Sequence, residues 1–132
     1  MKRLLVELKE LIDRLRRYNV RLVILFGSRV RGDYTDESDV DVLIVADELP
    51  EDPRESFAII YSYVSPKIHP ICLRTTSFLR KLRGESTFIM EILEDGRTVY
   101  ADSKFLEEVM SIYRDVRSKW VRKGKTWERI ST

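Results

Sequence analysis

Residues 20–45 read VRLVILFGSRVRGDYTDESDVDVLIV, and this stretch decides the fold. Its first seven residues form an apolar run rich in β-branched side chains, which predicts a strand that ends at Gly27. Residues 39–45 alternate and then become apolar, which predicts a second strand beside the first. The polar link between the two strands holds most of the chemically reactive side chains. We therefore expect the functional site where these strands meet.

The link begins with a glycine-bounded turn, GSRVRG. Gly27 lets backbone N–H groups approach an anion closely, and a short helix starting near Ser28 would direct its positive end at that anion. The Ser28 hydroxyl adds a donor, while Arg29 and Arg31 supply the charge that phosphate requires. Gly32 allows the turn to close without a Cβ atom. The turn therefore predicts a polyphosphate site.

The second expected strand begins with a pair of carboxylates, Asp39 and Asp41. On a strand, residues two apart share a face with Cα atoms about 6.6–7 Å apart, so both side chains can converge on one hard cation while Val40 faces the core. Magnesium normally takes one or two carboxylates and completes its shell with water and substrate phosphates. The pair thus predicts a magnesium site suited to phosphoryl or nucleotidyl transfer.

Together, the turn and the pair resemble the polymerase-β-like nucleotidyltransferase superfamily. The pattern of that family is Gly-Ser, a short helix, a glycine, and then Ser or Gly directly before Asp-x-Asp. In this chain Ser38 is the residue before Asp-x-Asp. The chain is most similar to the minimal nucleotidyltransferases of bacteria and archaea, which are often paired with a helical HEPN-domain protein. The resemblance covers about residues 5–101. It implies that Ser28 and Arg31 contact the nucleoside triphosphate and that Asp39 and Asp41 bind magnesium.

His69 marks a departure from that family. Active members usually have a third carboxylate on a later strand, which here is expected at residues 68–73, and His69 falls where the acid would be. No Asp or Glu occurs between Glu55 and Glu85. Three interpretations of His69 remain open. It is a strand residue without a catalytic role, or a general base that titrates near neutrality, or a ligand that shifts the metal preference toward zinc or manganese-like ions. The missing acid weakens the case for catalysis more than the case for nucleotide binding.

Apolar periodicity predicts the remaining elements. They are helices over 2–18, 53–61, 75–82 and 85–94, and a short strand over 97–100. A last helix is expected from a cap at Asp102 or Ser103, with Gly124 as its stop. The chain is thus predicted to be α/β (α+β), a small mixed sheet flanked by helices, nucleotidyltransferase-like, with an additional C-terminal helix. We expect a minimal nucleotidyltransferase domain over 1–101, and a helix with a basic tail over 102–132 that packs on or extends it.

The tail is basic and aromatic. It contains Arg117, Lys119, Trp120, Arg122, Lys123, Lys125, Trp127 and Arg129. Such a segment packs on its own domain or forms a homo-oligomer, docks a protein partner, or contacts RNA through phosphates and stacked bases.

Composition sets outer limits. A chain of 132 residues with net charge +2 is expected to form one domain, and the absence of a long apolar run or signal pattern predicts a soluble, cytoplasmic protein with no membrane contact. The single cysteine, Cys72, excludes an internal disulfide and is expected in the core. Charged residues make up 35% and glutamine is absent, a bias typical of thermophiles.

These observations leave two hypotheses. The leading one is an Mg²⁺-dependent enzyme that transfers a nucleoside monophosphate, AMP from ATP, to a hydroxyl acceptor. The family resemblance implies that the acceptor can be a tyrosine of a HEPN toxin, which would make the chain the antitoxin of a toxin–antitoxin pair. The alternative, motivated by the missing third acid, is a catalytically impaired module that binds nucleotide or a partner and acts by contact.

Overall fold

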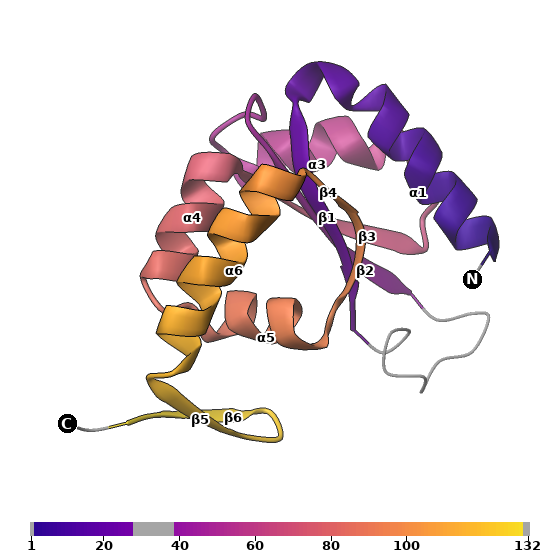
Figure 1. The fold of residues 1–132 in the computed structure, drawn as a ribbon. Helices are drawn as coiled ribbons and strands as arrows, with labels where there is room; N and C mark the ends of the chain where they lie inside the picture. The colour runs from indigo at the N-terminus through magenta and orange to yellow at the C-terminus, as the bar shows by residue number, and fades with distance from the viewer. Residues whose placement is uncertain (1, 28–38, 131–132) are drawn as a thin grey trace.

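The computed structural model describes residues 2–27 and 39–130 (Figure 1). Its centre is a four-stranded sheet in the order β3-β2-β1-β4. The strands are β1 (Val20–Phe26), β2 (Val40–Ala46), β3 (Ile68–Arg74) and β4 (Arg97–Ala101). β1 pairs antiparallel with β2 and β4, whereas β2 and β3 run parallel. The predicted mixed sheet is confirmed, as is the pairing of the first two strands.

Helices account for most of the rest of the described chain. They are α1 (Lys2–Arg14), the 3₁₀ turn η1 (Arg16–Tyr18), α3 (Pro53–Tyr61), α4 (Thr75–Arg83), α5 (Thr87–Asp95) and α6 (Ser103–Arg117). Side-chain caps fix three helix starts, because Asp52, Ser86 and Asp102 each accept a hydrogen bond from a backbone N–H of the first turn. The expected first helix is shorter than predicted, since its last turn tightens into η1 before Asn19 adopts a left-handed conformation.

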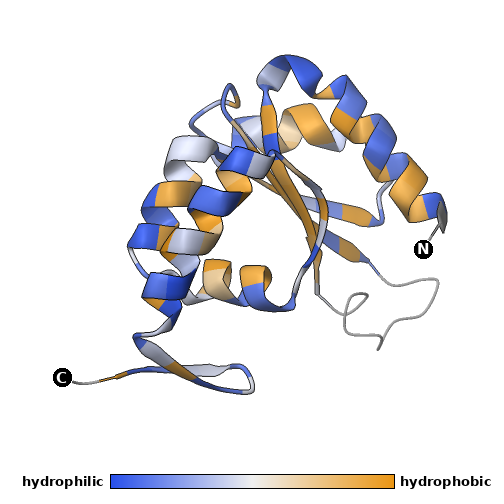
Figure 2. Ribbon diagram, viewed as in Figure 1, coloured by the Kyte–Doolittle hydropathy of each residue, from blue (hydrophilic) through white to orange (hydrophobic). Residues whose placement is uncertain are grey.

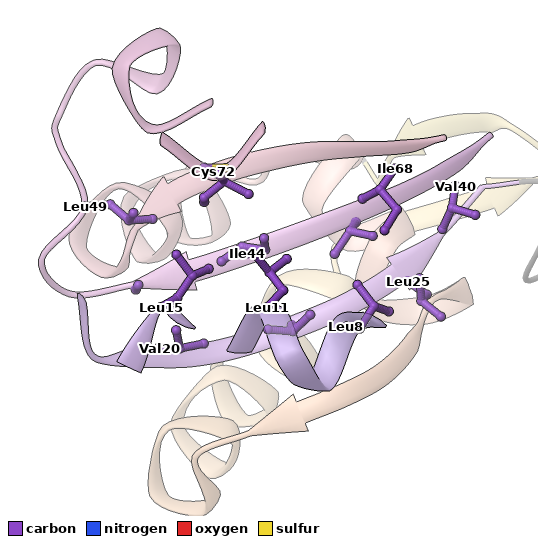
Figure 3. Close-up of a cluster of buried hydrophobic side chains, with 14 of the residues drawn as sticks. Leu8, Leu11, Leu15, Val20, Leu25, Val40, Ile44, Leu49, Ile68 and Cys72 are labelled. Atoms are coloured by element: carbon purple, nitrogen blue, oxygen red, sulfur yellow. The ribbon is translucent and has the colours of Figure 1, made fainter. Parts of the chain in front are cut away.

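The helices cover both faces of the sheet and make three layers (Figures 1 and 2). α1 and α3 pack on the face that holds Val23, Leu25, Val42 and Ile44 (Figure 3). α4, α5 and α6 pack on the opposite face, which holds Leu22, Ile24, Leu43 and Val45. Successive strand residues point to opposite faces, so β1 and β2 need apolar side chains at nearly every position. The apolar runs over 22–26 and 42–46 follow from this two-sided burial.

The C-terminal segment differs from the prediction. α6 ends at Arg117, and the expected continuation is instead a two-stranded hairpin of β5 (Trp120–Lys123) and β6 (Thr126–Arg129). Gly124 has a positive φ of 62°, which suits the two-residue turn that joins the strands. The predicted break at Gly124 is present, but it is the turn of a hairpin and not the end of a helix. Trp120 and Trp127 pack against the core of the α4–α6 face.

Cys72 lies in β3 on the α1–α3 face and is 3% exposed. Burial raises the pKa of its thiol to about 12. This burial confirms its assignment to the core. Within residues 2–27 and 39–130, no helix has the length and apolar character needed to cross a membrane.

Candidate active site

Three side chains form a row across one end of the sheet. Phe26, the last residue of β1, pairs with Asp41 of β2, and Asp41 pairs in turn with His69 of β3. Paired residues on adjacent strands direct their side chains to the same face. The row therefore lies on the face covered by α4, α5 and α6. Sequence reasoning predicted Asp41 and His69 as site residues, and the parallel pairing of β2 and β3 brings them side by side.

The bend after β1 contacts the Asp41 carboxylate. Gly27 has a φ of +92°, a conformation that side chains rarely adopt. A Cβ atom built on Gly27 would lie only 2.5 Å from Oδ2 of Asp41. Two properties of this position thus require glycine, namely its backbone angle and the carboxylate that fills the space beside it. The bend and this member of the acidic pair are adjacent in space.

Asp39 reaches the same end of the sheet from just before β2. Its Oδ2 atom lies 3.3 Å from Nε2 of His69, and the side chains are 63% and 54% exposed. Val40, between the two acids, is 1% exposed in the core of the opposite face. The alternation expected for the Asp-x-Asp strand is present. A pair this exposed contributes little to stability.

The other predicted phosphate-binding residues, Ser28, Arg29, Arg31, Gly32 and Ser38, lie outside the described residues, as does the short helix expected near Ser28. Their roles therefore remain predictions.

A cavity of about 430 Å³ opens beside this row. Phe26, Gly27 and Asp41 line it from the sheet, and Phe88 and Ile92 line it from α5. The rings of Phe26 and Phe88 meet edge to face, with centroids 5.8 Å apart. Small-molecule sites typically occupy about 300–1,000 Å³ and combine apolar walls with a few polar groups. The cavity has the size and the mixed lining of a small-molecule site.

Sequence reasoning missed the polar residues that complete the cavity. Glu91 and Asp95 line it from α5, and Lys125 lines it from the turn of the hairpin. One signal was present, because Phe88, Glu91 and Asp95 recur at the spacing of a single helix face. Nothing in the local sequence shows which element that face meets, so the contact with the bend could not be inferred.

The donor set near the cavity suits a hard cation. In the described part of the chain, no group of three or more His, Cys, Asp or Glu side chains is arranged to hold a metal ion. Asp39 and Asp41 supply the one or two carboxylates that magnesium takes from a protein, with water and substrate phosphates filling the remaining positions. The residues present therefore fit a magnesium ion that arrives with its nucleotide.

Residues 9–105 match the family model described as polymerase beta, nucleotidyltransferase. The chain belongs to this family. Its described elements from β1 to β4, including the row at the end of the sheet, fall within the match. The chain is therefore a nucleotidyltransferase domain, and its substrate is a nucleotide. The C-terminal hairpin lies beyond the matched residues.

A curated relative of this nucleotidyltransferase comes from Methanocaldococcus jannaschii and is named "Putative protein adenylyltransferase MJ0604". The two sequences are 35% identical over 99 residues, which cover 70% of this chain and 94% of the relative.

Solved structures show the same fold. A nucleotidyltransferase structure from Sulfolobus solfataricus is 26% identical, with a TM-score of 0.55 over 77% of this chain and 84% of that one. A chain in the complex of the tri-AMPylated Shewanella oneidensis HEPN toxin with an MNT antitoxin is 19% identical. It has a TM-score of 0.50 over 89% of this chain and 91% of its own length. At that identity the likeness concerns the fold alone.

Proposed function

We propose that this nucleotidyltransferase transfers AMP from ATP to a hydroxyl group on a protein. The observation that carries the proposal is the contact between the Gly27 bend and the Asp41 carboxylate at the mouth of a cavity of about 430 Å³. The 35% identical relative named as a protein adenylyltransferase supports both AMP as the transferred group and a protein as the acceptor.

In this proposal Asp39 and Asp41 hold a magnesium ion, which neutralises charge on the reacting phosphates when it is bound. Ser28 and Arg31 contact the triphosphate, as the family pattern implies, and Gly27, Arg29, Gly32 and Ser38 shape the surrounding turn. Phe88 is 47% exposed on the cavity wall and offers an apolar surface to the base or the ribose.

In the transfer step the acceptor oxygen attacks the α-phosphorus. A new bond forms between these two atoms, the bond from the α-phosphorus to the bridging oxygen breaks, and pyrophosphate leaves with the electron pair. The hydroxyl proton needs an acceptor, and we assign that role to His69. Its Nε2 atom lies 3.3 Å from the Asp39 carboxylate, at the end of the sheet where the metal would be held.

The acceptor we propose is a tyrosine of a HEPN-domain toxin, with this chain as its antitoxin. Fold similarity to a chain of the complex between an AMPylated HEPN toxin and an MNT antitoxin supports the assignment. Tyrosine suits the chemistry because its phenol loses a proton more readily than an aliphatic hydroxyl.

The test is transfer of label from α-labelled ATP with magnesium to a purified HEPN-domain toxin. The wild type should label that protein, and the double variant Asp39→Asn, Asp41→Asn should not. The matched control is Glu10→Gln, Asp13→Asn, which removes two charges from the exposed side of α1. Equal labelling by the Asp39, Asp41 variant would contradict the proposed mechanism.

A second function has its own supporting observation, since His69 occupies the strand position beside Asp41 where a third carboxylate is expected. The chain would then bind nucleotide or a toxin without transferring AMP. Calorimetry separates the two functions: binding of Mg-ATP together with no transfer to any protein hydroxyl would favour the contact mechanism.

A further inference from the structure

The C-terminal hairpin contributes to the cavity that Gly27 and Asp41 line. Lys125, at its turn, is a lining residue, although it lies 84 positions after Asp41 in sequence and beyond the family match at residues 9–105. Figure 1 shows the hairpin running alongside α5. A segment outside the common fold thus supplies a cation to the nucleotide cavity.

Arg122 joins the hairpin to α5 by hydrogen bonds and ion pairs. Its guanidinium donates hydrogen bonds to Glu91 at 3.1 Å, to Glu94 at 2.7 Å, and to both oxygens of Asp95 at 2.6 and 2.8 Å. Only 16% of the Arg122 side chain is exposed, so these charged contacts are partly shielded from water. They raise the pKa of Arg122, with Asp95 as the largest cause. The hairpin is therefore held in one position against α5.

Further contacts fix the turn itself. Nε of Arg122 donates to the carbonyl oxygen of Gly124 at 2.6 Å. The indole of Trp127 stacks beneath the guanidinium groups of Arg117 and Arg122, whose Cζ atoms lie 4.9 and 5.1 Å from the ring centroid. These contacts constrain the residues on both sides of Lys125, and so they set where its side chain begins.

The hairpin also changes the charge of the cavity. Without it, Asp41, Glu91 and Asp95 would give the lining three carboxylates, which repel a triphosphate. Arg122 bonds to Glu91 and Asp95 and its single positive charge offsets part of theirs, and Lys125 adds a second positive charge. The hairpin thus reduces the negative charge that repels phosphate and adds an ammonium group that attracts it.

Lys125 is available for a ligand. Among the described residues, none forms a hydrogen bond or an ion pair with its ammonium group. We propose that Lys125 binds a phosphate of the nucleotide in this cavity, so that the C-terminal hairpin is part of the substrate site. The inference rests on the proposed function, because it uses the same nucleotide. It adds a binding residue from outside the common fold.

The experiment measures equilibrium binding of Mg-ATP and of adenosine to the full chain. Lys125→Met keeps the length of the side chain and removes its charge, and it should weaken Mg-ATP binding about five- to twenty-fold, as expected for one partly exposed charge-assisted contact. Adenosine binding should not change, because adenosine has no phosphate. Lys125→Arg should bind Mg-ATP close to the wild-type level. Lys123→Met is the matched control, because it removes an exposed charge from the same hairpin outside the cavity.

The outcomes separate this inference from the proposed function. If Asp39→Asn, Asp41→Asn loses Mg-ATP binding while Lys125→Met binds like the wild type, the role of Lys125 is overturned and the proposed site stands. Equal weakening by Lys123→Met and Lys125→Met would also overturn it, since the effect would then be one of overall charge. Failure of the wild type to bind Mg-ATP would overturn both.

Discussion

Asp41 and His69 occupy matching positions on the parallel strands β2 and β3, each the second residue of its strand. A carboxylate and an imidazole therefore leave the same face of the sheet as neighbours. The proposed role of His69 as the proton acceptor rests on this relationship.

If His69 accepts the acceptor proton, His69→Gln should lower kcat about 10²- to 10⁴-fold. His69→Asp restores a carboxylate at the family position and should retain more activity than the Gln variant. Steady-state transfer from ATP measures both variants, and an unchanged kcat in His69→Gln would show that His69 has no part in proton transfer.

Gly27→Ala should abolish tight nucleotide binding. The new methyl group would lie 2.5 Å from Oδ2 of Asp41, so either the bend or the carboxylate must move. Gly124→Ala measures the backbone penalty alone, because Gly124 also has a positive φ but a Cβ there would have no atom within 4 Å. Each variant should lose about 1–2 kcal/mol of stability from the left-handed conformation. In Mg-ATP titrations, Gly27→Ala should bind far more weakly than Gly124→Ala. Comparable affinities would contradict the close contact.

Gly96→Ala tests how α5 is fixed to the sheet. Gly96 has an ordinary φ of −73°, so only space is at issue. Its added Cβ would collide with the carbonyl of Ile92 and would lie 2.5 Å from Cγ2 of Ile24. Overpacking of this kind costs about 1–3 kcal/mol.

Urea denaturation of Gly96→Ala should show that loss. In Gly84→Ala, where the nearest atom is the Arg80 carbonyl oxygen at 3.1 Å, the loss should be smaller. Equal midpoints for the two variants would mean that α5 shifts freely against β1.

Asp47 should make stability depend on pH in acid. Its carboxylate accepts hydrogen bonds from Arg21, Thr75 and Asn19 at the opposite end of the sheet from the cavity. The bond from Arg21 is the largest cause that lowers the pKa of Asp47, with those from Thr75 and Asn19 adding to it. A lowered native pKa stabilises the fold above the unfolded-state pKa of about 3.9, and that contribution is lost as the pH falls through the native pKa.

Asp47→Asn should therefore be less stable than the wild type by about 1–3 kcal/mol at pH 7. The difference should shrink below about pH 4 and vanish once the wild-type carboxyl is protonated. Thermal unfolding at several pH values measures it, and a difference that stays constant down to pH 2 would show that Asp47 charge does not stabilise the fold.

Most of the fold could be predicted because its signals are local. The apolar runs of β1 and β2, the cap at Asp102 and the break at Gly124 are all visible in sequence. The hairpin was missed because an aromatic and basic segment after a long amphipathic helix fits either a continued helix or a strand, and only its contacts with α5 decide between them.

The site divides in the same way. The proximity of Asp41 to the bend follows from two strands joined by one link. The α5 wall and Lys125 depend on tertiary packing across distant segments, which periodicity does not encode. Residues 28–38 hold the remaining predicted ligands, and their roles stay predictions.

The reactivity of the Cys72 thiol can report local opening of the α1–α3 layer. The thiol is buried in the α1–α3 layer, whereas the nucleotide cavity lies on the other side of the sheet. A thiol-reactive dye can label it only in molecules whose α1–α3 layer has come apart. The labelling rate would then measure how often that layer opens. A change in this rate on adding nucleotide would show that binding on one face of the sheet alters the stability of the other face.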